Sequence, residues 1–185
     1  MAGPMDHLNS SDKMITSASG AAAPSFDHPL EMLHACHGKI LRQCDTLKKL
    51  TGHLARQGCD EAAQQAAQGI LRYFDSAARL HHQDEELDLF PALRASAHAD
   101  KTQLDALLER LLSEHVVMMS AWDELRVVLL RLADGVYAPL PETLVERFIG
   151  SHVTHIAIEE TDLLPLASQL LNTRQMMQLG RSMAE

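Results

Sequence analysis

The 185-residue chain has few aromatic residues, few cysteines and no long apolar run, and acidic residues outnumber basic ones. Only 4 % of the residues are aromatic, and β-branched residues are sparse, which disfavours a β-sheet core. No apolar stretch approaches the ~20 residues of a transmembrane helix. The net charge is −9, with 25 acidic against 16 basic residues, so we expect neither nucleic acid nor a membrane surface as a partner.

The three cysteines form no C-x-x-C pair. An odd number of cysteines without a disulfide framework fits a reducing compartment, and we expect the protein in the cytoplasm. The first part of the chain, residues 1–26, is rich in Ala, Ser and Gly and lacks a compact apolar stretch. We therefore predict a disordered N-terminal leader rather than a signal peptide, followed by one domain over 27–185.

The rest of the chain is rich in the helix formers Ala, Leu, Gln, Glu and Arg. Turn and capping residues divide it into four long helices, and a short fifth helix is predicted near Thr173. The predicted long helices cover residues 27–58, 60–91, 100–134 and 141–165, the second ending at its proline or kinking there and continuing for a turn or two. Short connections predict an all-α, antiparallel up-down-up-down four-helix bundle with a short C-terminal helix.

Eleven histidines are present, and several fall where helical periodicity predicts burial. His37 and His115 each interrupt an otherwise apolar seam, in the first and third predicted helices. The seams of the second and fourth helices run through Leu71, Phe74, Ala78, His81, Glu85 and Asp88, and through Val145, Phe148, His152, His155, Glu159 and Asp162. These histidines are therefore expected to face the interior of the bundle.

Two segments, 74–91 and 148–165, align without a gap and form an internal repeat. Both carry His-x-x-x-Glu-Glu and end in proline. The matched pairs are Phe74/Phe148, His81/His155, Glu85/Glu159, Glu86/Glu160, Asp88/Asp162, Leu89/Leu163 and Pro91/Pro165. So many matched polar positions indicate a symmetric arrangement of the two helices.

Residues four apart on a helix lie ~5–6 Å apart on one face, so His-x-x-x-Glu presents a nitrogen and a carboxylate to one point. Two such helices, with one histidine from each of the other two, supply four nitrogens and two carboxylates. Buried carboxylates without cations are costly, and this donor mixture suits Fe, Zn or Mn. We predict a dinuclear metal site with the ligands His37, His81, Glu85, His115, His155 and Glu159.

Other polar residues leave alternatives open. A single histidine in a seam is more often a hydrogen-bonded core residue, so ligation depends on the joint pattern. His82 and Glu86 share the four-residue spacing but lie ~100° from the seam, which favours the flank or the surface. His152 is an alternative additional ligand. Asp88 and Asp162 fit either an orienting role behind a ligand histidine or a solvated end of the bundle.

These residues resemble the hemerythrin-like, HHE cation-binding family over roughly residues 28–184. The resemblance rests on Leu33-x-x-x-His37, on HHQDEELDLFP and HIAIEETDLLP, and on the pair Glu114-His115. It implies a non-haem, oxo- or hydroxo-bridged di-iron centre in a four-helix bundle, with the two glutamates as bridges.

The pattern departs from that of the oxygen-carrying members of the family. Those proteins have a second histidine where this chain has Met119, and His-x-x-x-x-Asp where this chain has His155-x-x-x-Glu159. The pattern is closer to members linked to iron-centre repair, iron sensing, or the response to oxygen and nitric oxide.

We therefore expect a metal-binding protein with two Fe ions that binds O₂ or NO, or that senses or handles iron. A di-iron oxidase or peroxidase, and a structural bundle holding a redox-silent cation such as zinc, are the alternatives. Turnover would need a proton donor near an open site and a substrate path. The sequence identifies neither, which favours a binding protein over an enzyme.

Overall fold

The computed structural model describes residues 25–96 and 100–184, and within them every regular element is a helix. The elements are α1 (Pro29–Gln57), α2 (Glu61–Phe74), α3 (Ala77–Gln83), the π-helix η1 (Asp84–Leu89), α4 (Phe90–Arg94), α5 (Lys101–Ala133), α6 (Glu142–Ile158), the π-helix η2 (Glu159–Leu163), α7 (Leu164–Leu170) and α8 (Thr173–Ser182). The predicted leader lies outside the described residues except for Ser25 and Phe26, so its boundary stays a prediction.

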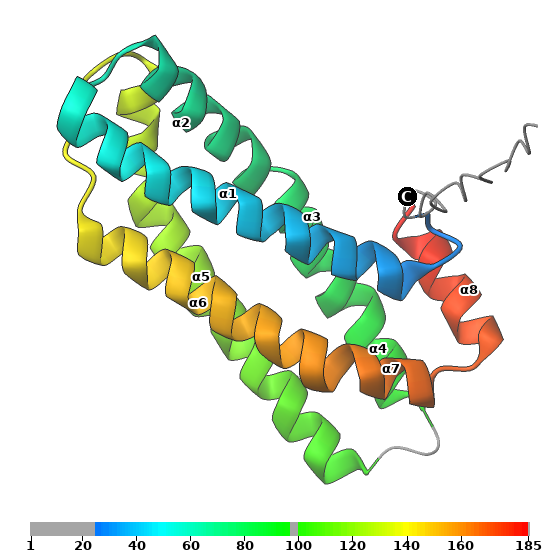
Figure 1. Cartoon of the computed structure of the whole chain (residues 1–185). Helices are drawn as coiled ribbons and strands as arrows, with labels where there is room; N and C mark the ends of the chain where they lie inside the picture. Colours follow the sequence, from blue (N-terminus) through cyan, green and yellow to red (C-terminus); the bar gives the residue numbers. More distant parts are fainter. Residues whose placement is uncertain (1–24, 97–99, 185) are drawn as a thin grey trace, which may run out of the picture.

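Four long helical rods run antiparallel and form a bundle (Figure 1). The first rod is α1, the second is α2 to α4, the third is α5, and the fourth is α6 to α7. α1 packs against α2 and α6, and α5 packs against the same two helices. The short α8 lies across the end of the bundle at which α1 begins (Figure 1). The predicted four-helix bundle with a short C-terminal helix is confirmed.

Capping and turn residues set the ends of the helices. The Asp60 side chain accepts a hydrogen bond from the Ala63 backbone N–H at 2.9 Å, at the start of α2. Asp100 caps α5 in the same way. Gly58 and Gly135 follow α1 and α5 with φ of 72° and 76°, the left-handed region that favours glycine. The predicted ends of these helices are confirmed.

The second rod is not the single continuous helix predicted from Asp60 onward. It is interrupted after α2 at Asp75 and Ser76, where Ser76 has φ −127° and ψ −87°. The second and fourth rods then each pass through a π-helical stretch. In a π-helix each N–H bonds to the carbonyl five residues back. Both rods continue as α-helix past their prolines, within α4 and α7.

The π-helical stretches shift the buried face of these rods by one residue. Leu89 and Leu163 are fully buried, whereas Asp162 is exposed and Asp88 is half-buried. The predicted seam positions of the two aspartates are therefore wrong. An undistorted period of 3.6 residues places them inward, but the extra residue of each π turn brings the following leucine there instead.

Two clusters of buried apolar side chains fill the bundle, one on each side of a polar layer. The larger cluster includes Phe74, Trp122 and Phe148. The smaller cluster, near α8, includes Leu33 and Leu89. On each rod the buried seam passes from one cluster to the other through the histidines and glutamates predicted as ligands. Apolar packing on both sides therefore holds the polar layer at a fixed level.

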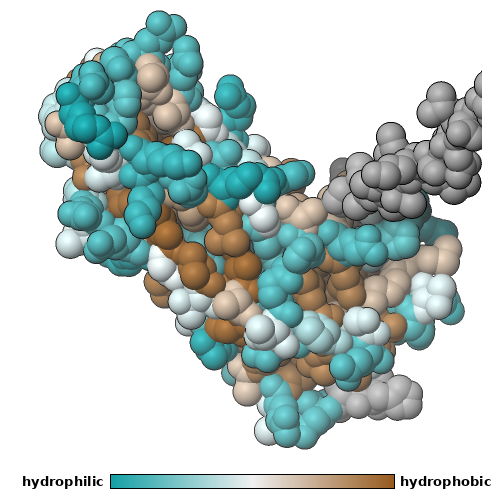
Figure 2. Space-filling view, in the orientation of Figure 1, coloured by the Kyte–Doolittle hydropathy of each residue, from teal (hydrophilic) through white to brown (hydrophobic). Residues whose placement is uncertain are grey.

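The outer surface is mostly hydrophilic on the face drawn in Figure 2, with hydrophobic residues gathered in a band between α1 and α6. Among the helices of the described residues, none is long and apolar enough to span a membrane. This agrees with the absence of a long apolar run in the sequence.

Candidate metal centre

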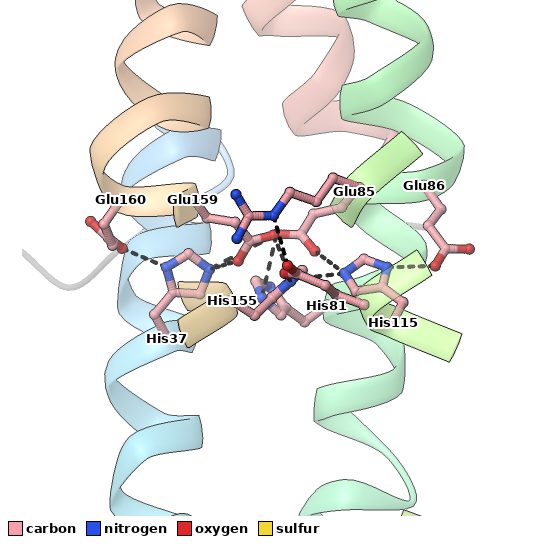
Figure 3. A network of polar contacts seen from close by, with 10 residues as sticks. His37, His81, Glu85, Glu86, His115, His155, Glu159 and Glu160 are labelled. Carbon is pink, nitrogen blue, oxygen red and sulfur yellow. Dashed lines mark hydrogen bonds and ion pairs between the residues drawn. The ribbon is translucent and has the colours of Figure 1, made fainter. Parts of the chain in front are cut away.

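The structure brings all six predicted ligands into one buried layer, and each rod contributes to it (Figure 3). The six residues are at most 2 % exposed. They are His37 on α1, His81 on α3, Glu85 on η1, His115 on α5, His155 on α6 and Glu159 at the start of η2. His81 and His155 each lie ten residues before a proline, and the antiparallel bundle brings them to one level.

The layer consists of two groups that share both glutamates. His37 and His81 belong to one group, and His115 and His155 belong to the other. Within each group, one ligand atom from every residue lies within 4.8 Å of the others. The layer could therefore hold two metal ions, each surrounded by four residues.

Each glutamate turns one oxygen toward each pair of histidines. Glu159 Oε2 lies 3.1 Å from His37 Nε2, and its Oε1 lies 2.9 Å from His155 Nε2. Glu85 Oε1 lies 3.4 Å from the Nε2 atom of His81, and its Oε2 lies 3.5 Å from that of His115. A carboxylate so placed can bridge two adjacent cations.

The π-helical stretches fix these two glutamates locally. The backbone carbonyl of Glu85 accepts the N–H of Phe90, and that of Glu159 accepts the N–H of Leu164, each five residues further along. Single π turns of this kind are frequent at functional sites. Here they allow a ligand glutamate and the following glutamate to approach two different histidines.

A second set of carboxylates contacts three of the four histidines on their outer side (Figure 3). The distances from Nδ1 to the carboxylate are 2.5 Å for His37–Glu160, 2.6 Å for His115–Glu86 and 2.9 Å for His155–Glu114. Such a carboxylate fixes the orientation and tautomer of a ligand histidine and raises the basicity of its other nitrogen. We call Glu86, Glu114 and Glu160 the outer glutamates.

The sequence pattern does not predict the role of the outer glutamates. Glu86 is 37 % exposed, in keeping with the predicted flank position, yet its carboxylate reaches His115 from there. Two signals in the sequence point to these residues. Glu86 and Glu160 are matched in the repeat, and Glu114 directly precedes a ligand histidine.

The donor atoms of the layer fit bound metal ions. When an outer glutamate accepts the Nδ1–H of His115 or His155, a lone pair is left on Nε2, and these two Nε2 atoms are 3.0 Å apart. Two lone pairs at this distance repel each other without a cation. Across the described residues, the buried side-chain N and O atoms that lack a hydrogen-bond partner all belong to the layer: His37 Nε2, His81 Nδ1 and both carboxylate oxygens of Glu85 and Glu159.

The charges of the layer also favour bound cations. Burial opposes ionisation of Glu159, but contacts with His155 and His37 hold its pKa well below the ordinary value. Burial also opposes protonation of His37, yet the nearby carboxylates of Glu159 and Glu85 raise its pKa to about 10. The two buried carboxylates therefore stay ionised and need protonated histidines or bound cations to balance them.

Two further histidines lie beside the layer and outside both groups. The ring of His82 stacks on His115, with centroids 4.0 Å apart. His152 donates its Nδ1–H to the Phe148 carbonyl at 2.8 Å. The structure thus brings together the six predicted ligands and gives neither His82 nor His152 a place in either group.

Comparison with known proteins agrees with this site. The family model of the hemerythrin HHE cation binding domain matches residues 28–167, a range that contains the whole polar layer. An uncharacterized protein of Haemophilus influenzae is 35 % identical over 160 residues, which cover 86 % of this chain and 90 % of that protein. The repeated His-x-x-x-Glu helices, the shared glutamates and this match together show that the chain belongs to the hemerythrin HHE cation-binding family.

Proposed function

We propose that the chain binds two iron ions in the buried layer and uses them to bind O₂ or a related small molecule such as NO, or to sense or handle iron. The observation that carries this proposal is the position of Glu85 and Glu159 between two histidine pairs. A carboxylate with one oxygen toward each pair suits two adjacent cations. Imidazole and carboxylate together are donors that suit iron.

Each set of residues has a distinct task in this proposal. His37 and His81 would hold one ion, and His115 and His155 would hold the other. When bound, iron supplies electrons and an open coordination position for a small molecule. The outer glutamates fix the orientation and tautomer of the rings, so that Nε2 can face a bound ion. The apolar clusters on both sides exclude bulk water from the layer.

Burial restricts what can reach the layer. A hollow of about 10 Å³, bordered by Phe74, Met118, Trp122, His82 and His152, lies beside it. This is the space of about one water molecule, so only small ligands fit there. Burial lowers the pKa of His82 to about 2 and that of His152 to about 4, so both rings line the hollow in the neutral form.

Zinc is the second candidate, and the number of residues in each group favours it. Each group offers four residues, and a structural zinc ion is satisfied by four tetrahedral ligands. Zinc has no redox chemistry and would leave no open position. A zinc-filled layer would tie the four rods together and carry out no oxygen chemistry.

Metal content and the optical spectrum distinguish these functions. The protein is purified without oxygen, assayed for metals and then exposed to air while its near-ultraviolet and visible spectrum is recorded. We expect two irons per chain, one for each group, and a new charge-transfer band on exposure to air. A band that disappears when oxygen is removed supports a binder or sensor, and an irreversible one supports an oxidase. Zinc with no spectral change would contradict the proposal.

A further inference from the structure

Three of the four ligand histidines have a carboxylate behind them, and the fourth does not. Nδ1 of His81 is fully buried and has no hydrogen-bond partner among the described residues. His115 and His155 are both held by outer glutamates. In the other pair only His37 is held, by Glu160. The Glu160 carboxylate also contacts His34 of α1 at 2.8 Å. The two groups are therefore unequal.

The internal repeat shows which partner is missing. It relates Glu86, behind His115, to Glu160, behind His37. The same relation exchanges the first rod with the third and the second with the fourth. The remaining outer glutamate should therefore have a counterpart on the first rod.

The counterpart of Glu114 on the first rod is a cysteine. Glu114 directly precedes His115 on α5 and holds the ligand histidine of α6. The residue that directly precedes His37 on α1 is Cys36. Where the symmetry calls for a carboxylate to hold His81, the chain has a thiol.

A cysteine at this position cannot replace a glutamate. The side chain of Cys36 is half-buried, and a thiol is only a weak hydrogen-bond acceptor. Within the described residues Nδ1 of His81 has no hydrogen-bond partner. The first rod therefore supplies no carboxylate behind His81.

Resting on the proposed function, we propose that the two metal positions have unequal affinities. The position between His115 and His155 retains its ion, and the position between His37 and His81 exchanges its ion. Loss of a carboxylate behind a ligand histidine typically weakens metal binding ~10–100-fold. The exchangeable position would then fill and empty over a range of free iron in which the other stays occupied, as iron sensing or iron handling requires.

Binding affinities measured on matched variants test this inference. The metal-free full-length chain is titrated anaerobically with Fe(II) in competition with a chelator of known affinity. The wild type should bind two ions whose affinities differ ~10–100-fold. Cys36→Glu supplies the missing carboxylate and should raise the weaker affinity toward the tighter one. Glu114→Cys is the reverse change and should lower the tighter affinity toward the weaker one.

Two controls make the result specific. Cys36→Ala should leave both affinities unchanged, and the double variant Cys36→Glu/Glu114→Cys should again show two different affinities. Equal affinities in the wild type, or a Cys36→Ala variant that weakens binding as Glu114→Cys does, would overturn the inference. Fewer than two bound ions in the wild type would instead contradict the proposed function. Circular dichroism shows whether Cys36→Glu folds. If it does not, the affinity of Glu114→Cys tests the inference, since this change introduces no charge.

Discussion

The two repeated segments, 74–91 and 148–165, carry the same ligands in different surroundings. Each contributes one histidine, one shared glutamate and one outer glutamate to the polar layer. Each also passes through a π-helical stretch before its proline. These ligands and outer glutamates, on which the geometry of the layer depends, are thus matched in the repeat.

The positions that differ determine the surroundings of the layer. The pairs that differ in chemistry include Asp75/Ile149, Ala78/His152 and His82/Ile156. Asp75 lies at the break in the second rod, whereas Ile149 lies within the continuous helix α6. His82 and His152 border the same small hollow from different rods. The comparison separates residues required by the layer from residues that shape what surrounds it.

The largest expected effect distinguishes the shared glutamates from the outer ones. Glu85→Gln or Glu159→Gln removes a charge common to both groups, so we expect bound iron to fall from two ions to one or none. Glu86→Gln or Glu160→Gln removes only the carboxylate behind one histidine, so we expect two ions, one of them bound ~10–100-fold more weakly.

Iron per chain after anaerobic desalting measures the loss of an ion, and chelator competition measures the weakening. The glutamine side chain keeps the volume of glutamate, so packing is nearly unchanged. Equal loss of iron in all four variants would contradict the distinction between the shared and the outer glutamates.

The parts of this arrangement that the sequence predicts depend on local rules. The helix ends at Gly58, Asp60, Asp100 and Gly135 follow from capping and turn chemistry. The burial of the ligand histidines follows from the helical period, and their common level follows from their distances to the helix ends in an antiparallel bundle. No contact between distant residues needs to be known for any of these.

The rest depends on contacts between rods, which a single helical period does not describe. The π turns place Leu89 rather than Asp88 in the core, because one extra residue enters the turn. Glu86 reaches a histidine on the neighbouring rod from a flank position. At the break in the second rod, Asp75 accepts a hydrogen bond from Trp122 on α5.

A smaller effect distinguishes His152 from its counterpart Ala78. Burial, partly opposed by the hydrogen bond to the Phe148 carbonyl, lowers the pKa of His152 to about 4 in the folded chain. An unfolded histidine titrates near pH ~6.5, so between these values the unfolded chain binds more protons. Stability from the neutral ring is present above about pH 6.5 and is lost as the pH falls toward about 4.

We expect the metal-free wild type to lose about 3 kcal/mol of unfolding free energy relative to His152→Ala over that pH window. Urea unfolding at a series of pH values measures the difference. Ser151→Ala is the matched control, since the Ser151 hydroxyl bonds to the same Phe148 carbonyl at 2.9 Å but does not titrate. Its difference from the wild type should not change with pH, and a constant difference for His152→Ala would contradict the prediction.

The smallest effect concerns the break that only the second rod has. Asp75 accepts hydrogen bonds from the Trp122 indole N–H at 3.1 Å and from Arg126 Nε at 2.9 Å. Trp122 is 3 % exposed, so Asp75→Ala leaves a buried donor without an acceptor. We expect the free energy of unfolding to fall by about 1–3 kcal/mol. Arg126→Ala removes only a partly exposed ion pair and should cost at most about 1 kcal/mol.

Both variants should keep the full iron content, because Asp75 and Arg126 lie outside the polar layer. Urea unfolding and metal analysis of the same samples test the two effects separately. If Asp75→Ala loses iron while Arg126→Ala does not, the break in the second rod positions His81 itself. The second rod would then position its ligand histidine through a contact with α5, whereas the fourth rod positions His155 through the continuous backbone of α6.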